Sequence, residues 1–514
     1  MTERKIVIGL IMSTEYLQQV KPIWNNHFLE SVAAKRIADW AWEYFDQFNR
    51  APKREIETIF FEKIKASNFP KDIAEEIEED ILPSLSKEYQ RDSVNLDYLL
   101  DLTSKYFQER NLLIVSEQIQ ALLSKGKLDD AEKLACDYKP ITAGTREDLD
   151  LSSDIVLTRI DKAFNSSFQS VITYPKQLGE YWNDQLIRGA FVALMASEKR
   201  GKTFWLLDMA LRACKAKKKV AFFQAGDMTE DQQLKRICVY LTKKSDLSKY
   251  CGEQWEPVKD CVHNQSNNCE KPERECNFGP FEGRTTDDIR KETQLSDLIE
   301  AYKEFPEYSP CFNCEEYNHK PWGVVWIRPV DVGEALTAKE AKVAVNKFFI
   351  KNKLNFKLSS HANGTLSVKQ IQGILRIWEK QDGFIPDLIV IDYADLLVPE
   401  TKLEYRHQQN DIWKGLRNLS QSNGNPLVVT ATQADAKSYE TNRLKLTNFS
   451  EDKRKYAHVT AMYGLNQDPQ GREKKLGLMR INEIVKREGD FSNGNEIIIL
   501  QNLKRGRPFL GSFK

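Results

Sequence analysis

The sequence has no excess of charge of either sign, no long apolar run and few cysteines for its length. Lys plus Arg and Asp plus Glu each number 75 among 514 residues, so the formal net charge is zero. A uniformly basic nucleic-acid coat is therefore excluded, and any nucleic-acid site must be a local basic patch. No apolar run approaches the roughly 18 residues that span a bilayer, and Ile6–Met12 is too short for a signal peptide. Nine cysteines are too few for a secreted disulfide scaffold of this size, so we expect a soluble, cytoplasmic protein without a membrane partner.

The chain divides into stretches with different periodicity. Apolar residues recur at three- and four-residue spacing in residues 1–145, which predicts an all-α N-terminal domain. A break near Lys139–Gly144 leads into a linker, residues 146–172, with a short helix at Ser153–Phe164. In residues 173–514, short apolar runs alternate with helical segments, which is typical of an α/β domain with a parallel sheet. The runs of buried-strand type are Phe191–Met195, Val220–Phe223, Leu388–Ile391 and Pro426–Thr430, with further strands at Gly477–Lys486 and Glu496–Gln501.

Residues 247–325 interrupt this α/β domain with a different composition. They hold six of the nine cysteines, and Cys251–Lys320 contains 16 acidic and 8 basic residues, a net charge of −8. We expect an inserted subdomain with little apolar core. Its charge argues against duplex binding, and a role in docking a protein or bracing a subunit is favoured.

Four cysteines of the insertion form two separated pairs, one of them C-x-x-C. They are Cys261, Cys269, Cys311 and Cys314. Two such pairs of thiolates are typical of a closed tetrahedral Zn²⁺ site, which would supply folding free energy to this segment. Substitute ligands are Cys251, Cys276, His263 and His319. The alternative is a set of buried free cysteines, or a redox pair.

A candidate phosphate-binding loop follows the first apolar run of the α/β domain. Its eight residues are Ala196, Ser197, Glu198, Lys199, Arg200, Gly201, Lys202 and Thr203. They match the P-loop pattern G-x-x-x-x-G-K-[ST], except that Ala196 replaces the first glycine. In such a loop the backbone N–H groups hold the phosphates, Lys202 reaches the β- and γ-phosphates, and Thr203 binds Mg²⁺. The alternative is a basic surface loop that caps a helix.

A second apolar strand, Leu388–Ile391, ends in the carboxylate of Asp392. Open α/β sheets bind ligands at the carboxyl ends of their strands, so Asp392 is expected near Lys202 and Thr203. There it would hold Mg²⁺ directly or through water, which predicts ATP and Mg²⁺ as cofactors. The alternative is that Asp392 only caps a helix.

With these motifs the chain resembles the DnaB-type replicative DNA helicases, a RecA-like hexameric family. The resemblance covers nearly the whole chain apart from residues 247–325, and it includes the strands Ile389–Tyr393 and Val429–Gln433. It implies a RecA-like P-loop core behind an all-α domain, and a homo-hexameric ring that hydrolyses ATP. It also implies 5′ to 3′ translocation on single-stranded DNA, unwinding of duplex, and a primase or loader protein as partner. The insertion and the altered loop suggest a phage, plasmid or otherwise divergent replication system.

The resemblance also implies roles for three further residues. Gln433 lies at the family's γ-phosphate-sensing position. Asp227 takes the place of the catalytic glutamate that orients and deprotonates water, and it could also cap the following helix. Arg487 matches the arginine finger, which stabilises transition-state charge in a neighbouring subunit, with Arg505 as a rival.

Lys453, Arg454 and Lys455 resemble the family's DNA-binding loop, and Pro399–Arg406 is a weaker candidate. The C-terminal stretch Arg472–Lys514 carries 10 basic and 5 acidic residues, a net charge of +5. Phosphate contacts carry no base information and weaken with salt. The alternative is a solvated charged loop.

Two other functions are compatible with this sequence. A catalytically weakened relative that serves as a ring or loader-like replication component is suggested by Ala196 and Asp227, whereas the intact Lys202, Thr203 and Asp392 oppose it. A RecA-class recombination or repair ATPase would share the core but not the helical N-terminal domain.

Overall fold

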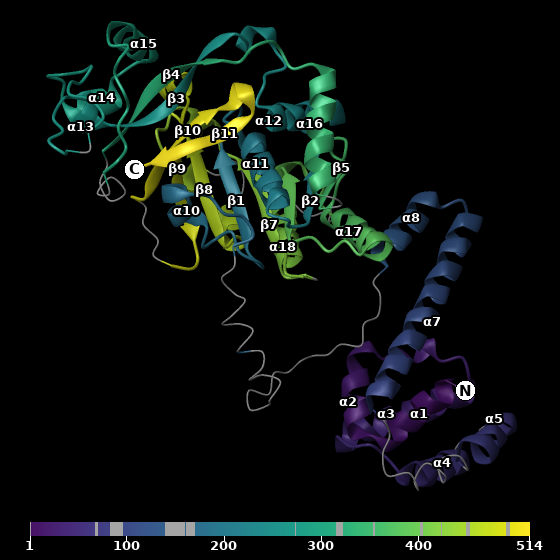
Figure 1. Ribbon diagram of the computed structural model, residues 1–514. Coiled ribbons are helices and arrows are strands. Elements are labelled where there is room, and N and C mark those ends of the chain that lie inside the picture. The colour runs from purple at the N-terminus through teal and green to yellow at the C-terminus, as the bar shows by residue number, and fades with distance from the viewer. Residues whose placement is uncertain are drawn as a thin grey trace. The chain divides into compact units, whose positions relative to one another are not determined.

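The structure is a computed structural model, and it divides into two compact units, Met1–Ile160 and Asp161–Lys514 (Figure 1). None of the helices in the described part of the chain is long and apolar enough to cross a membrane. The predicted linker helix Ser153–Phe164 lies outside the described residues, apart from Ile160. The structure describes residues 2–66, 70–82, 96–138, 160, 170–272, 274–314, 322–352, 355–400, 405–422, 424–448, 453–489 and 494–514.

The N-terminal unit is helical, as its apolar spacing predicts. Apolar side chains of α1, α3 and α7 pack into one core, in which Ile37 and Phe107 are almost completely buried. Ser31 caps the start of α3 by accepting a hydrogen bond from the backbone of Ala34, and Asn49 ends it in the left-handed conformation. The helices are α1 (Thr2–Met12), α2 (Thr14–Val20), α3 (Val32–Phe48), α4 (Glu55–Ala66), α5 (Lys71–Glu76), η3 (Ile77–Ile81), α7 (Leu96–Ser124) and α8 (Leu128–Asp137), with short turns η1 (Lys21–Ile23) and η2 (Asn26–Phe28).

The second unit is built on a nine-stranded sheet with the order β11-β10-β9-β8-β1-β7-β6-β2-β5. The strands from β8 to β5 in this order are parallel, and β9, β10 and β11 add an antiparallel edge. A parallel-dominated α/β sheet is thus confirmed, although the sequence did not reveal β5 or β11. The strands are β1 (Phe191–Ala196), β2 (Val220–Gln224), β5 (Phe356–Ser360), β6 (Leu388–Asp392), β7 (Leu427–Gln433), β8 (Ala461–Asn466), β9 (Leu478–Lys486), β10 (Glu496–Asn502) and β11 (Arg507–Phe513).

Helices cover both faces of this sheet. On β1, Val192 and Leu194 pack into a core with Trp205 of α11, whereas Phe191 and Ala193 pack with α17 and α18 on the other face. Because both faces are buried, the central strands are apolar without alternation. The helices are α10 (Lys176–Trp182), α11 (Lys202–Lys215), α12 (Glu230–Thr242), α16 (Ala338–Lys351), α17 (Val368–Asp382), α18 (Tyr405–Ser420) and α19 (Arg472–Leu476), with short turns η6 (Ala394–Leu396), η7 (Ala436–Tyr439), η8 (Leu446–Asn448), η9 (Lys453–Ala457) and η10 (Leu503–Arg505).

The insertion is an antiparallel hairpin that carries short helices. Its elements are η4 (Ser248–Tyr250), β3 (Glu253–Cys261), α13 (Val262–Gln265), α14 (Thr286–Lys291), α15 (Leu295–Glu304) and β4 (Gly323–Asp331). The expectation of little apolar core was wrong. Phe281 and Trp326 form a buried cluster with Phe513 of the antiparallel edge, because the acidic residues of the segment lie mostly outside it. Glu256 is buried and ion-paired with Arg505 at 2.9 Å, which ties the hairpin to the main sheet.

Candidate nucleotide-binding site

The predicted P-loop connects the central strand β1 to the helix α11. Ala196 ends β1 in extended backbone and is fully buried, so alanine fits where the pattern has glycine. Gly201 precedes the first residue of α11 with φ of 90°, a left-handed conformation that favours glycine. A Cβ atom there would lie 2.9 Å from Leu503 Cδ1, which adds a steric reason for glycine. The loop therefore has the strand, turn and helix that phosphate binding requires.

The ammonium group of Lys202 folds over this loop. Its Nζ atom donates hydrogen bonds to the carbonyl oxygens of Ala196 (3.0 Å) and Ser197 (3.3 Å). Burial lowers the pKa of Lys202, and the carboxylates of Asp395 and Asp227 act in the opposite direction. Lys202 is thus a partly desolvated cation at the start of a helix, where an anionic phosphate would be held strongly.

Thr203 and Asp392 meet beside Lys202. The Thr203 hydroxyl donates to Asp392 Oδ1 at 3.3 Å, whereas the buried Asp392 Oδ2 has no hydrogen-bond partner among the described residues. Burial raises the pKa of Asp392 to about 6, against the opposing effect of the Thr203 hydrogen bond. A hydroxyl oxygen and an unpartnered carboxylate oxygen are ligands that suit Mg²⁺, so the residues present fit the predicted ion.

Asp227 follows β2 at the same edge of the sheet and is exposed. Its charge raises the pKa of Asp392, which places the two carboxylates within electrostatic reach. Asp227 does not cap the following helix, because Thr229 caps α12 in a capping box with Gln232. A pocket of about 360 Å³ opens beside Asp227 and is also lined by Phe204 of α11. Asp227 is therefore free to act on a ligand at this edge.

Gln433 ends β7 next to the loop. Its Nε2 atom donates to Glu198 Oε1 at 3.0 Å, and its backbone N–H donates to Asp395 Oδ2 at 2.8 Å. The side chain thus contacts a residue of the P-loop from the neighbouring strand. The sequence did not single out Asp395, although its position three residues after Asp392 was a usable signal.

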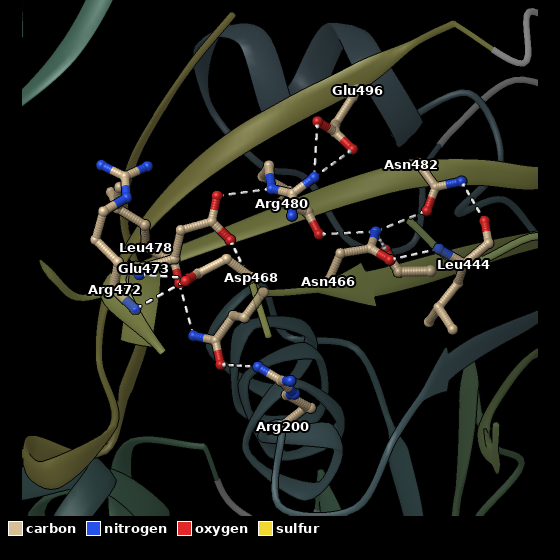
Figure 2. Close-up of polar contacts among 12 residues, drawn as sticks. Arg200, Leu444, Asn466, Asp468, Arg472, Glu473, Leu478, Arg480, Asn482 and Glu496 are labelled. Atoms are coloured by element: carbon tan, nitrogen blue, oxygen red, sulfur yellow. Dashed lines mark hydrogen bonds and ion pairs between the residues drawn. The ribbon is translucent and has the colours of Figure 1, made fainter. Parts of the chain in front are cut away.

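Polar contacts connect the loop to the antiparallel strands (Figure 2). Arg200 Nη1 donates to Gln467 Oε1 at 3.0 Å, and Gln467 Nε2 donates to the carbonyl oxygen of Leu478 at 2.7 Å. Nearby, Arg480 Nε lies 2.7 Å from Glu473 Oε1. These amide contacts have no regular spacing in the sequence, so only the fold reveals them.

Basic side chains surround a second pocket beside the loop, with a volume of about 160 Å³. No acidic residue and none of Lys202, Thr203 and Asp392 lines this pocket. It adds positive potential next to the loop, which would attract anions. The basic residues that line it are Lys199, Arg200, Lys474, Lys475, Lys504 and Arg505.

Arg487 lies at the opposite edge of the sheet from the P-loop. The register pairs Lys486 with Ala461, and Ala461 with Val192 near the start of β1. The Arg487 guanidinium donates to the carbonyl oxygen of Ala457, far along the strands from the loop of its own chain. The rival Arg505 is ion-paired with Glu256 within the chain.

Of the three predicted DNA-binding residues, Lys455 does not fit. Its side chain is fully buried, and its Nζ atom lies 2.8 Å from Asp395 Oδ1, so it cannot reach a phosphate in solvent. The sequence missed this because a lysine in a basic run has the same pattern whether it is solvated or paired inside. The side chains of Lys453 and Arg454, and residues 401–404 of the weaker candidate, lie outside the described part.

The four predicted zinc ligands line one cavity of about 440 Å³, together with His263. The carboxylate of Asp260 holds two of them in place, because it accepts the backbone N–H of Cys261 at 2.7 Å and of Cys311 at 2.9 Å. Even so, no three His, Cys, Asp or Glu side chains of the described residues are close enough to hold one ion. Cys251 and Cys276 do not line the cavity, and His319 is outside the described residues.

The loop after β1, the carboxylate after β6 and the helices on both faces of a mostly parallel sheet together make a RecA-like P-loop fold. No protein-family model and no curated protein matches the sequence.

Among solved structures, a DnaB-like replicative helicase, described with its interactions with primase, is similar to this chain. The TM-score is 0.52 at 13% identity, and the match covers 98% of each chain. An ATPase domain matches at 14% identity over 70% of this chain and 98% of that chain, and its TM-score of 0.45 carries no argument. The chain therefore has the fold of a DnaB-like replicative helicase, as the sequence resemblance implies.

Proposed function

We propose that this protein is an ATP-driven DNA helicase that works as a hexameric ring of identical subunits on single-stranded DNA. The observation that carries the proposal is the meeting of Lys202, Thr203 and the buried Asp392 at one sheet edge. It is supported by a fold shared with a DnaB-like replicative helicase over 98% of both chains. That helicase is described with its interactions with primase, and a primase or loader is the partner that we propose here.

In the proposed reaction the loop backbone and Lys202 hold the β- and γ-phosphates of ATP. Thr203 and Asp392 would hold a Mg²⁺ ion, which supplies positive charge to the phosphate oxygens. Asp227 orients the attacking water and accepts its proton. Gln433 registers the γ-phosphate, because it contacts Glu198 of the loop.

The ring follows from where Arg487 lies. At the amino end of the parallel strands it is remote from its own P-loop, so a neighbouring subunit must supply the positive charge that stabilises the transition state. DNA binding is assigned to Lys453 and Arg454, with phosphate contacts that weaken as salt rises. Lys455 is left out of this set because it is buried.

The proposal is tested by measuring ATP turnover with and without single-stranded DNA, together with unwinding of a forked duplex. We expect DNA-stimulated turnover and ATP-dependent unwinding, and neither in Lys202→Ala. A folded hexamer without DNA-stimulated turnover would favour the weakened, loader-like component. Filaments in place of closed rings in electron micrographs would favour the RecA-class recombination or repair ATPase.

The insertion is proposed to bind one Zn²⁺ through Cys261, Cys269, Cys311 and Cys314. Support comes from the single cavity that these thiols line, and from Asp260, which fixes two of their backbones. The thiols must close around the ion, since no three are within ligand distance in the described part of the chain. Thiolate binding would then add folding free energy to the hairpin.

Zinc content per chain, measured by elemental analysis of the purified protein, tests this assignment. We expect one Zn²⁺ in the wild type and a loss in Cys314→Ser, with faster proteolysis around residues 250–320. Cys276→Ser is the matched control, because the Cys276 sulfur accepts the N–H of Ser309 at 3.0 Å outside the cavity. Metal-free protein with a protease-resistant insertion would refute the zinc proposal.

A further inference from the structure

A buried ion pair crosses the layer between the sheet and α18. The Lys455 side chain is 0% exposed and that of Asp395 is 12% exposed, and Nζ lies 2.8 Å from Oδ1. The same Nζ atom lies 5.7 Å from the centre of the Trp413 ring of α18. A lysine in this setting keeps its charge only while Asp395 compensates it, so the two side chains must move together.

Asp395 belongs to the nucleotide-binding edge. It lies in η6, directly after the strand that ends in Asp392. Its carboxylate accepts the backbone N–H of Gln433 at 2.8 Å and the hydroxyl of Thr432 at 2.9 Å. Asp395 therefore fixes the end of β7, from which Gln433 reaches Glu198 in the P-loop.

Lys455 belongs to a segment that ends at the opposite edge. After η9, the carbonyl oxygens of Ala457 and Thr460 accept hydrogen bonds from the guanidinium and the backbone N–H of Arg487, the latter at 2.9 Å. Residues 455–460 therefore connect Asp395 at the carboxyl ends of the strands to Arg487 at the amino ends.

We propose that the Asp395–Lys455 pair couples the nucleotide site of a subunit to the finger that the same subunit offers its neighbour. A shift of Gln433 on nucleotide binding moves Asp395, and the buried pair carries this shift through residues 455–460 to Arg487. Tightly packed, dry groups of this kind favour discrete arrangements over continuous deformation. Both are positioning residues, and the assignment rests on the proposed function only for the role of Arg487.

Hydrogen exchange of residues 455–460, with and without a non-hydrolysable ATP analogue and Mg²⁺, tests the coupling directly. The test variant is the double substitution Asp395→Asn with Lys455→Met, which leaves no unpaired buried charge and keeps an acceptor for Gln433. The control is Lys357→Met, which breaks another lysine–aspartate pair, with Asp382, whose ammonium also lies over a tryptophan, Trp378. That pair lies at β5, on the edge of the sheet.

We expect the analogue to slow exchange in residues 455–460 at least threefold in the wild type and in the control, and not in the double variant. DNA-stimulated turnover of the double variant should fall at least tenfold, with nucleotide affinity within about twofold of wild type. An equal exchange response in the double variant would show that the pair only braces the fold. The coupling is likewise refuted if nucleotide binds and wild-type residues 455–460 do not respond. A wild type that responds and does not unwind DNA would refute the proposed function and leave the coupling standing. If no nucleotide binds, both fall.

Discussion

Replacing Asp392 with asparagine should make the protein more stable and less able to use nucleotide. The buried Asp392 carboxylate has a pKa raised to about 6 from an ordinary value of 3.8, chiefly by burial. A carboxyl group with a raised folded-state pKa destabilises the fold when it is ionised, because the unfolded chain holds the charge more easily. Asparagine has nearly the same shape and removes that charge.

The magnitude follows from the shift of about two pKa units. At 1.36 kcal/mol per unit, ionised Asp392 costs about 3 kcal/mol at pH 8. The cost is relieved as pH falls through 6 towards 3.8, and at pH 5 about 1.6 kcal/mol remains. For a unit of about 350 residues, 3 kcal/mol corresponds to an increase in Tm of about 4 °C.

Thermal melts at pH 8 and pH 5, without nucleotide and with a chelator, measure this difference. Asp392→Asn should melt about 4 °C above wild type at pH 8, and about half that gap should remain at pH 5. Adding Mg²⁺ and ATP at about 100 times Kd should stabilise wild type by about 2.7 kcal/mol and the variant by much less. The variant should therefore lose its advantage when ligand is present.

Asp227→Asn is the control for this measurement, because Asp227 is an exposed carboxylate at the same edge. Its melting temperature should match wild type at both values of pH. The reasoning is refuted if Asp392→Asn is no more stable than wild type at pH 8, or if the gap does not change with pH. Equal stabilisation of both proteins by Mg²⁺ and ATP would remove Asp392 from the metal site.

Three further predictions concern catalysis. Lys202→Ala should abolish ATP hydrolysis and leave the far-UV circular dichroism unchanged, and wild-type turnover would refute the P-loop assignment. Asp227→Asn should bind nucleotide normally and lose at least a hundredfold in turnover, within the range for a general base; Asp227→Glu should keep activity, whereas unchanged turnover in Asp227→Asn would exclude Asp227 as the base. Arg487→Ala should be inactive alone and regain turnover when its subunits exchange into rings with Lys202→Ala, since mixed interfaces join an intact loop to an intact finger. If exchange occurs without recovery, the finger lies elsewhere, with Arg505 the first residue to test.

The periodicity of the sequence predicted the two kinds of unit, because burial on one helical face or on both faces of a strand leaves a local signature. Phe191–Met195 and Leu388–Ile391 are apolar without interruption, and both are central strands of the sheet. The strand β5 was not predicted, since an edge strand with the sequence Phe356–Ser360 is only half buried and carries lysine and serine. The core of the insertion was also missed, because its apolar residues come from segments far apart in the chain.

The sequence by itself determined the phosphate loop and the carboxylate opposite it, because Gly201, Lys202, Thr203 and Asp392 follow a pattern set by local backbone geometry. Only the tertiary structure decided where the remaining charges lie. It buried Lys455 against Asp395, and it placed Arg487 at the edge of the sheet remote from the loop. A charged residue has the same local pattern in solvent and in an ion pair, so its partner is fixed only when distant segments pack together.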